Sequence, residues 1–558
     1  MACIDDLPEE ILEFILCLVS PYNDLRSCMQ VCQRWYDCCH SVVEKRKSRF
    51  YSSLKAGCIE WFSVPYPSNI IPISKRYSHC ASVHESSMFV FGGCTSTKTT
   101  FNDLWRFDLG THEWTRLLTT GTYPSPKAHA SMVTWKNHLV LFGGWTHPSL
   151  YPLHQQWVLF NELHVYDIVG NRWTQLYYPG APPLTAGHSA TMHGNIMVMF
   201  GGLQKHEGTS ASTNNIYCLD LQSQCWFKPV VSEPMPNPRY SHSQIKIDDK
   251  HILILAGCGG SNKLYTDVWL LTLPNNFKNG NEVWRWEQIT VDEIEQQPSQ
   301  MQHNPACKVG NSVVMLAATR LDSNISGGNM SQLLVPEAVR RQPANIWVPP
   351  PVEAQQPHQQ QPNDHNADRL QQDHNINGQR GFLRNRNVEL LESSSDEDEI
   401  AGNNAGMKAR HRARPSIRPN ASNNRDMRHQ MLARMQERLK ELSRKEANNG
   451  VAKNPVANPT NNTIQKISRT TIVPFLLDIS KVVKEKKAKW LSNSQGNNGG
   501  NVIGNPPMPS LRYSLVVGRG HLIMFGGTSQ DPAGVQSPEV VYNTTTFISA
   551  PSSSHYAV

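Results

Sequence analysis

The sequence lacks several features that would place it in a common class of protein. It has no run of about 18 apolar residues, as a membrane-spanning helix requires, and its first residues are acidic where a secretory signal would be basic. Its 13 cysteines are irregularly spaced and include no Cys-x-x-Cys pair, so they suggest neither a disulfide framework nor a zinc site. We therefore expect an intracellular protein, cytoplasmic or nuclear or both, with reduced thiols and no cofactor or metal.

Catalytic motifs are missing as well. The sequence contains no phosphate-binding loop, no nucleophile elbow and no H-E-x-x-H, and its Gly-Gly pairs end apolar runs instead of opening helices. We predict that the chain is not an enzyme.

The net charge of +7 is concentrated in one segment. Residues 401–450 contain 12 Lys and Arg against 4 Asp and Glu, so the rest of the chain is close to neutral. A basic charge confined to a low-complexity stretch belongs to that stretch and does not make the folded parts bind nucleic acid. Neither nucleic acid nor a membrane is expected as a partner.

The first fifty residues predict short amphipathic helices. Apolar residues at helical spacing cover residues 5–19, residues 20–24 interrupt the pattern, and it resumes from Leu25 to about Val43. Two or three short helices cannot close a core of their own. A partner must therefore cover their exposed apolar face.

The same residues resemble the F-box family. The matching residues are Leu7-Pro8-Glu9-Glu10-Ile11-Leu12, Ile15-Leu16, Asp24-Leu25, Val31-Cys32 and Trp35. The resemblance implies that residues 1–50 bind the Skp adaptor of cullin–RING ubiquitin ligases and, through it, the cullin and RING subunits. The residues expected to bind the adaptor are Leu7, Pro8, Ile11, Leu12, Ile15, Leu16 and Trp35. The alternative is that these helices only cap the following domain.

From residue 76 a unit recurs in which one strand ends in Gly-Gly, a later one ends in Asp, and a last one carries Trp. The Gly-Gly pairs start at residues 92, 143 and 201, and seven residues separate the aromatic or Leu before each Asp from the next Trp. Self-similarity at this period is typical of a β-propeller. Gly-Gly would allow a tight turn where a Cβ would clash, and Trp would fill the gap between neighbouring blades.

These units resemble Kelch repeats, which implies an all-β propeller of six blades after the small all-α F-box. Blade five lacks Gly-Gly, and its third and fourth strands are predicted only at Val473–Asp478 and Trp490. We therefore predict a disordered insertion, rich in Gln, Asn and Pro, inside blade five. The expected segments are the F-box at 1–50, a connection at 51–75, blades one to five (first half) at 76–319, the insertion at 320–470, the remaining blades at 471–548 and a tail at 549–558.

The sixth unit leaves the closure of the propeller open. It contains Gly526-Gly527 and a third-strand signal at Val541-Tyr542-Asn543, but no Trp follows. Either a strand carrying Trp61 completes this blade from the N-terminal side, or Phe547-Ile548 completes it from the C-terminal side. One of the two must do so, because an unclosed propeller leaves sheet edges open.

Three pieces of the insertion suggest regulation or binding. Residues 393–399 form an acidic serine-containing run, either a kinase site or a solvated stretch. Residues 408–414 form a basic cluster. Residues 425–446 place Met and Leu on one helical face, as in a partner-binding helix or a transient one.

The candidate binding residues lie where each blade begins. His79, His129, His188 and His242 occupy one place in successive units, which indicates a structural role. The resemblance implies that the loops entering each blade gather at one mouth, where Arg-Tyr-Ser triplets would accept an acidic or phosphorylated peptide of a protein substrate. The expected residues are Arg76, Tyr77, Arg239, Tyr240, Arg512 and Tyr513. The alternative is that each Arg pairs with a carboxylate or backbone of a neighbouring blade.

Together the two resemblances imply the substrate-recognition subunit of an SCF (Skp–cullin–F-box) ubiquitin ligase, which binds target proteins and promotes their ubiquitination and degradation. A Kelch interaction scaffold, for example a cytoskeletal one, is the leading alternative. A propeller oxidase is a third.

Overall fold

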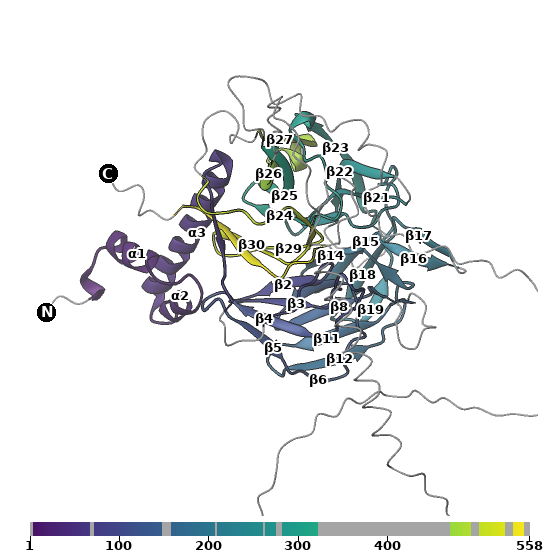
Figure 1. Ribbon diagram of the computed structural model, residues 1–558, viewed down its shortest axis with the longest axis horizontal. Helices are drawn as coiled ribbons and strands as arrows, with labels where there is room; N and C mark the ends of the chain where they lie inside the picture. The colour runs from purple at the N-terminus through teal and green to yellow at the C-terminus, as the bar shows by residue number, and fades with distance from the viewer. Residues whose placement is uncertain are drawn as a thin grey trace, which may run out of the picture. The chain divides into compact units, whose positions relative to one another are not determined.

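The fold is taken from a computed structural model that describes most of the chain outside one long central segment (Figure 1). The described residues are 4–66, 72–147, 158–206, 209–260, 263–274, 282–321, 469–492, 502–529 and 540–551. The expected insertion at 320–470 lies outside them, with its acidic run, basic cluster and Met-rich stretch, except for its first two and last two residues, which belong to strands.

The N-terminal part is helical, as the F-box pattern predicts. After a 3-10 turn at Ile4–Asp6, α1 spans Glu9–Cys17 and begins directly after Pro8, with two glutamates in its first turn. Helix α2 spans Asn23–Cys28, and α3 spans Gln33–Ala56, well beyond the expected end near Val43. Gly57 ends α3 in the left-handed region, at φ 69°. The helices share a small core made of Leu12, Leu16, Leu25, Cys38, Cys39, Val42 and Val43.

The remainder is mostly β-strand and propeller-like, in antiparallel sheets of four strands. The first sheet contains β2 (Cys80–His84), β3 (Ser87–Phe91), β4 (Leu104–Asp108) and β5 (Trp114–Leu117). The second contains β7 (Ser131–Trp135), β8 (His138–Phe142), β11 (Leu163–Asp167) and β12 (Arg172–Leu176), with β6 (Thr120–Gly121) added parallel to β12. The third contains β14 (Ser189–His193), β15 (Ile196–Phe200), β18 (Ile216–Asp220) and β19 (Cys225–Phe227).

The next sheet has eight strands, because two four-stranded halves join through the parallel pair β23 and β27. One half contains β20 (Ser243–Lys246), β21 (His251–Cys258), β22 (Leu264–Thr272) and β23 (Arg285–Asp292). The other contains β24 (Ala306–Val309), β25 (Ser312–Leu321), β26 (Arg469–Asp478) and β27 (Lys487–Trp490). Strands β25 and β26 pair along their whole length, from Ser312 opposite Asp478 to Leu321 opposite Arg469. Residues 322–468 therefore connect two neighbouring strands of one sheet.

The last sheet combines both ends of the described chain. Its order is β29 (Ser514–Val517), β30 (His521–Phe525), β32 (Thr545–Ser549) and β1 (Glu60–Ser63). The sequence-based third strand at Val541-Tyr542-Asn543 is wrong: Val541 makes only an isolated bridge to Thr528, and the third strand is β32, which contains Phe547 and Ile548. Trp61 lies in the fourth strand and pairs with Ile548.

The innermost strands of these sheets contact one another in a cycle. Strand β2 contacts β7, and the cycle continues through β14, β20, β24 and β29 back to β2. Three smaller sheets accompany these strands: β9 (Trp145–Thr146) with β10 (Val158–Leu159), β13 (Thr185–Ala186) with β16 (Leu203–His206) and β17 (Thr209–Ser212), and β28 (Ser510–Leu511) with β31 (Thr528–Ser529). The connections also contain a 3-10 turn at Ile294–Gln296 and the short helix α5 (Val482–Glu485).

The predicted roles of Trp and Gly-Gly are confirmed. In the first four units the Trp of the fourth strand packs on the Phe that precedes Gly-Gly in the previous sheet, with ring centroids about 5 Å apart; the pairs are Trp114–Phe525 (4.7 Å), Trp173–Phe91 (5.5 Å), Trp226–Phe142 (4.9 Å) and Trp286–Phe200 (5.1 Å). Both glycines of Gly92-Gly93 have positive φ, and a Cβ on Gly92 would lie 2.3 Å from the carbonyl oxygen of Lys127, in the segment that leads into the next sheet.

None of the described helices combines the length and the apolar character needed to cross a membrane.

Candidate binding sites

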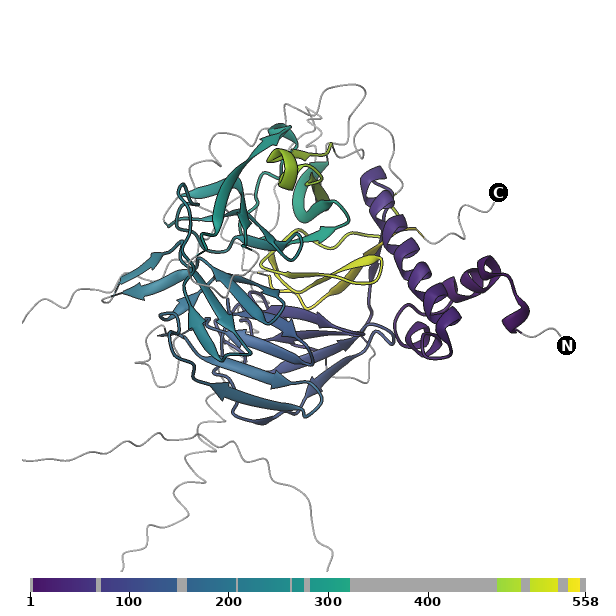
Figure 2. The same ribbon diagram turned by 180° about the vertical axis from the view of Figure 1, so that it is seen from behind.

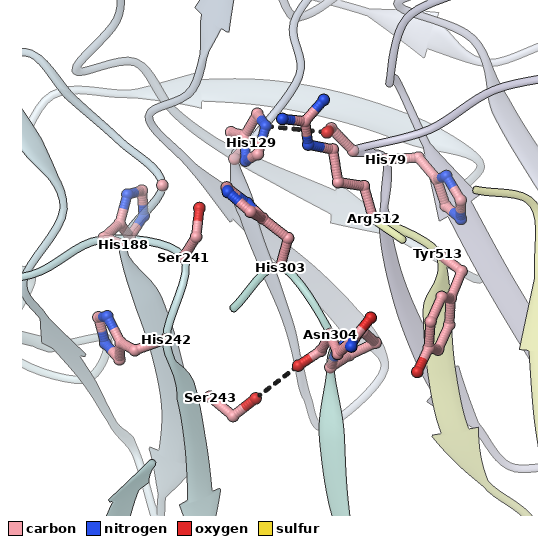
Figure 3. Close-up of a pocket in the computed structure, with 14 residues that line it drawn as sticks. His79, His129, His188, Ser241, His242, Ser243, His303, Asn304, Arg512 and Tyr513 are labelled. Carbon is pink, nitrogen blue, oxygen red and sulfur yellow. Dashed lines mark hydrogen bonds between the residues drawn. The ribbon is translucent and has the colours of Figure 1, made fainter. Parts of the chain in front are cut away.

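A cavity of about 220 Å³ lies where the inner strands begin (Figure 3). It is lined by Ser78, His79, His129, Ala130, Gly187, His188, Ser241, His242, Ser243, His303, Asn304, Pro305, Arg512 and Tyr513. These residues come from all six four-stranded units, so the cavity marks the point on which the units converge.

A closed ring of backbone hydrogen bonds frames this cavity. One residue from each unit donates its N–H to the carbonyl of the equivalent residue in the preceding unit, at 2.8–3.4 Å; the six residues are Ser78, His129, Gly187, Ser241, His303 and Arg512. All six have a φ between 51° and 69°. Five of them are not glycine, and such a conformation costs each about 1 kcal/mol or more unless the surroundings hold it. The ring supplies that support, because each residue is bonded on both sides.

Three histidines connect neighbouring units just beyond this ring. His79, His188 and His242 each share a hydrogen bond between Nε2 and a serine hydroxyl of the preceding unit: Ser514 at 2.9 Å, Ser131 at 2.8 Å and Ser189 at 2.5 Å. Burial lowers the pKa of His79 and His188 to about 3, so these imidazoles are neutral at physiological pH. Their role is structural, as predicted.

His129 differs from those three, contrary to the expected equivalence. It stands in the backbone ring itself, one position earlier than His79, and Ala130 takes the His79 place. Its imidazole meets that of His303 at a centroid distance of 6.5 Å, and its Nε2 shares a 2.8 Å hydrogen bond with the Ser78 hydroxyl. His303, which was not among the candidate residues expected from the sequence, is therefore part of the same group (Figure 3).

Arg512 completes this central group. Its guanidinium lies 5.7 Å from the centre of the Tyr77 ring. Burial, and then the charge of Arg512, lower the pKa of His129 to about 3 and that of His303 well below its ordinary value. Among the residues that line the cavity, Arg512 is the charged one at neutral pH. The arrangement can offer an anionic group one cation and two neutral imidazoles.

Arg76 and Arg239 were expected at this mouth, and that prediction is wrong. Both are fully buried in matching networks. Arg76 binds both carboxylate oxygens of Asp103, at 2.7 and 3.0 Å, and Arg239 binds those of Asp267, at 2.7 and 2.9 Å. Pairing with a carboxylate was the alternative, but each partner belongs to the same unit and not to a neighbouring one: Asp103 directly precedes β4, and Asp267 lies within β22. A third ion pair of this kind, which the sequence analysis did not predict, joins Lys127 to Glu162 at 2.6 Å in the second unit.

The tyrosines of the triplets are buried too, and the third triplet is out of register. Tyr77, Tyr240 and Tyr513 are all at most 7% exposed. Arg512 stands in the backbone ring at the place of Ser78, two positions later than Arg76. The sequence does contain this signal: Arg76 precedes Gly92 by 16 residues, whereas Arg512 precedes Gly526 by 14. The shared letters Arg-Tyr-Ser concealed the shift.

A second candidate site is the apolar stripe of α1. Ile11, Phe14, Ile15 and Leu18 follow one another at helical spacing and are 36–74% exposed. Leu12 and Leu16, expected to bind a partner, instead point into the helical core and are at most 1% exposed, so they support the stripe from within. Of the other expected residues, Pro8 is exposed, while Leu7 and Trp35 are half-buried. Phe14 and Leu18 were not among the adaptor-binding residues expected from the sequence.

Comparisons with known proteins agree with both parts. Residues 4–44 match the family model described as "F-box-like", and residues 76–279 match "FBX42, beta-propeller domain". The N-terminal helices are thus similar to F-box-like domains, and residues 76–279 are similar to the propeller domain of FBX42. The similar curated proteins include Kelch domain-containing protein 3 of Rattus norvegicus, 26% identical over 251 residues, and that of Homo sapiens, 27% identical over 252. Each alignment covers 44% of this chain and 61% of the relative, so the chain spans about 61% of their length.

A similar solved structure is described as "Structure of YjhT". It is 16% identical, with a TM-score of 0.36, and the alignment covers 45% of this chain and 75% of that one.

The F-box-like domain and the central cavity lie at opposite ends of the inner hairpins. The cavity is lined where β2 begins, whereas Arg26 of the domain pairs with Glu85 in the turn between β2 and β3. A strand of five residues spans about 17 Å. Figures 1 and 2 both show the three helices together at one side of the sheets. A partner on α1 and a partner at the cavity therefore have separate access.

Proposed function

We propose that this chain is the substrate-recognition subunit of an SCF (Skp–cullin–F-box) ubiquitin ligase. The F-box-like domain would bind the Skp adaptor, and through it cullin and RING subunits, while the propeller holds a target protein for ubiquitination and degradation. The chain would act inside the cell and supply proximity, leaving the chemistry to other subunits. The observation that carries this proposal is the exposed apolar stripe of α1 on a domain that matches the F-box-like family model.

The finer architecture belongs to the same proposal. We infer a closed six-bladed propeller whose last blade is completed by β1, with residues 322–468 as an insertion in blade five. The backbone ring of six residues and the cycle of inner strands support this count. A closed ring suits a receptor, because it leaves no open sheet edge to compete for other chains.

The adaptor would sit on the stripe formed by Ile11, Phe14, Ile15 and Leu18. Exposed large apolar side chains at i, i+3, i+4 and i+7 are the anchors that a helix presents to a hydrophobic groove. Of the residues expected from the sequence, Ile11 and Ile15 belong to this stripe, whereas Leu7, Pro8 and Trp35 do not.

The substrate would enter at the central cavity and meet Arg512, His129 and His303. One cation beside two neutral imidazoles suits a carboxylate or a phosphate, so the substrate segment would be acidic or phosphorylated. Arg76 and Arg239 take no part, because their guanidiniums are neutralised by Asp103 and Asp267.

A non-ligase Kelch scaffold is the second candidate. The observation in its favour is that α3 packs into the propeller: Phe50 and Leu54 belong to one core cluster with Leu522 of β30. A helical cap would do the same.

A pull-down from cells separates the two. The intact chain is compared with the triple variant Ile11→Ala, Phe14→Ala, Leu18→Ala and with the control Leu118→Ala, Val169→Ala, Tyr177→Ala, whose side chains are 80–82% exposed on the propeller. We expect the intact chain and the control to recover the Skp adaptor and cullin, and the α1 variant to lose both. Absence of the adaptor from all three samples would favour the scaffold.

A further inference from the structure

Tyr22 joins the F-box-like domain to the propeller. It follows α1, yet it is only 1% exposed and belongs to one core cluster with Ile523 and Phe547 of the last sheet. Its hydroxyl shares a 2.8 Å hydrogen bond with Nε2 of His521 and accepts one of 3.1 Å from the backbone N–H of Arg519. Burial, the largest influence, raises the pKa of this phenol to about 12, so it stays protonated.

The turn between β29 and β30 is shaped around this tyrosine. The turn contains Gly518, Arg519 and Gly520. A Cβ on Gly518 would lie 2.4 Å from the Tyr22 hydroxyl, and one on Gly520, at φ 92°, would lie 3.1 Å from the carbonyl oxygen of Arg46 in α3. Arg519 donates a 2.8 Å hydrogen bond to the Pro21 carbonyl and stacks 5.5 Å from the centre of the Tyr22 ring. Side chains at the two glycine positions would push the helices away.

Two more contacts hold the domain at other hairpin turns. Arg26 of α2 binds both carboxylate oxygens of Glu85, between β2 and β3. Tyr51 of α3 packs against Gly310, between β24 and β25, and its hydroxyl lies 3.2 Å from that of Ser312. The attachment points thus lie on three neighbouring sheets. Contacts to three different sheets restrain the rotation of the domain as well as its position.

We infer that the contact between the helical domain and the propeller is a rigid joint that fixes the direction of the cavity relative to the α1 stripe. Tyr22, bound in the Gly518-Arg519-Gly520 turn, is its central residue. Tyr22 and Arg519 are then positioning residues, which touch neither the adaptor nor the substrate. This part of the inference rests on the proposed function. If the joint swivels, the held substrate samples a larger volume, and its effective concentration at the ubiquitin carrier falls.

Distance measurements on the full chain test the joint itself. Nitroxide labels are placed through unnatural amino acids at Glu10 of α1 and Thr174 of β12, both exposed, which avoids the native cysteines. The variants are Tyr22→Ala and, in case that one fails to fold, Arg26→Ala with Arg519→Ala. Tyr22→Phe keeps the ring, and Tyr177→Ala is the matched control on an exposed tyrosine. We expect the distance distribution to widen at least twofold in the first two, less in Tyr22→Phe, and not in Tyr177→Ala. An unchanged width in a folded joint variant would overturn the inference.

Self-ubiquitination in a reconstituted adaptor–cullin–RING complex tests the consequence. Mass spectrometry maps the modified lysines of the chain, with adaptor binding measured in parallel. We expect a restricted set of lysines in the intact chain and a broader set in the joint variants at equal adaptor binding. An identical set despite a wider distance distribution would overturn the positioning role. If the intact chain does not bind the adaptor, the proposed function fails, and the distance measurement alone decides the joint.

Discussion

Arg76 donates a hydrogen bond to each carboxylate oxygen of Asp103, and the same guanidinium donates a third to the carbonyl of Gly92 at 3.0 Å. The arginine thus connects the approach to the first strand, the Gly-Gly turn and the start of the third strand. Arg239 repeats this arrangement with Asp267 and the carbonyl of Ala256. The pairs therefore support the segments that lead to the cavity and do not line it.

Replacing Arg239 should destabilise the fold far more than replacing Arg512. Arg239→Ala would leave the carboxylate of Asp267 without its buried partner, at a cost of about 3–5 kcal/mol. Arg512 lines the open cavity, so Arg512→Ala should cost less and, under the proposed function, weaken binding of the substrate. Urea denaturation measures the free energy of unfolding of both variants. Similar losses in the two variants would contradict this division of roles.

The stability of the propeller should fall as the pH drops below about 6.5. Burial lowers the pKa of His79, His129 and His188 to about 3, whereas an unfolded histidine titrates near 6.5. The unfolded chain therefore binds more protons between these values. The contribution of each histidine is complete above pH 6.5 and is lost as the pH falls toward the folded pKa, at about 1.4 kcal/mol per pH unit.

One substitution isolates this effect. His188→Asn places there the residue that the fifth four-stranded unit has at the same position, Asn304, and removes the titrating group. We expect the slope of unfolding free energy against pH, between pH 6 and 4, to decrease by about 1.4 kcal/mol per unit. His40→Asn, at an exposed site on α3, is the control. An unchanged slope for His188→Asn would show that the histidine is not neutral in the fold.

The sequence predicted the elements whose residue type is dictated by one recurring contact. Gly143 and Trp173 could be placed because only glycine tolerates the close approach of the next sheet and only a large ring fills the gap. The buried side of α1 could not, since residues 11, 12, 15 and 16 are all apolar and periodicity alone does not say which pair a core takes. The register of Arg512 was lost for a similar reason, because identical triplets hide a two-residue shift.

Gly143→Ala should be much more destabilising than Gly194→Ala. The two glycines have similar φ values, 68° and 59°, so the backbone strain of an alanine is alike. A Cβ at position 143 would lie 2.5 Å from the carbonyl oxygen of Thr185, whereas nothing lies within 4 Å of one at position 194. We expect about 1–2 kcal/mol for Gly194→Ala and a larger loss for Gly143→Ala, measured by thermal unfolding. Equal losses would mean that the next sheet yields to the methyl group.

Removing the F-box-like domain should destabilise the propeller, by an amount that depends on the residue at which the chain is truncated. Phe50, Leu54 and Trp61 are at most 5% exposed and pack in one cluster with residues of β25 and β30. Truncating one such side chain costs about 2–5 kcal/mol, and removing β1 also exposes the edge of β32. A chain lacking residues 1–63 loses all of these contacts. One lacking residues 1–44 keeps them and loses mainly Tyr22.

Calorimetry of three chain lengths checks this dependence. We expect a single cooperative transition for the intact chain, a transition at lower temperature without residues 1–44, and no cooperative transition, or aggregation, without residues 1–63. A cooperative transition of intact height for the shortest chain would show that β1 and the end of α3 are dispensable. If the expectation holds, a loss of binding by that shortest chain reports an unfolded sheet and cannot test the proposed adaptor contact. The α1 variant Ile11→Ala, Phe14→Ala, Leu18→Ala leaves the buried contacts intact and is then the appropriate variant for testing the proposed function.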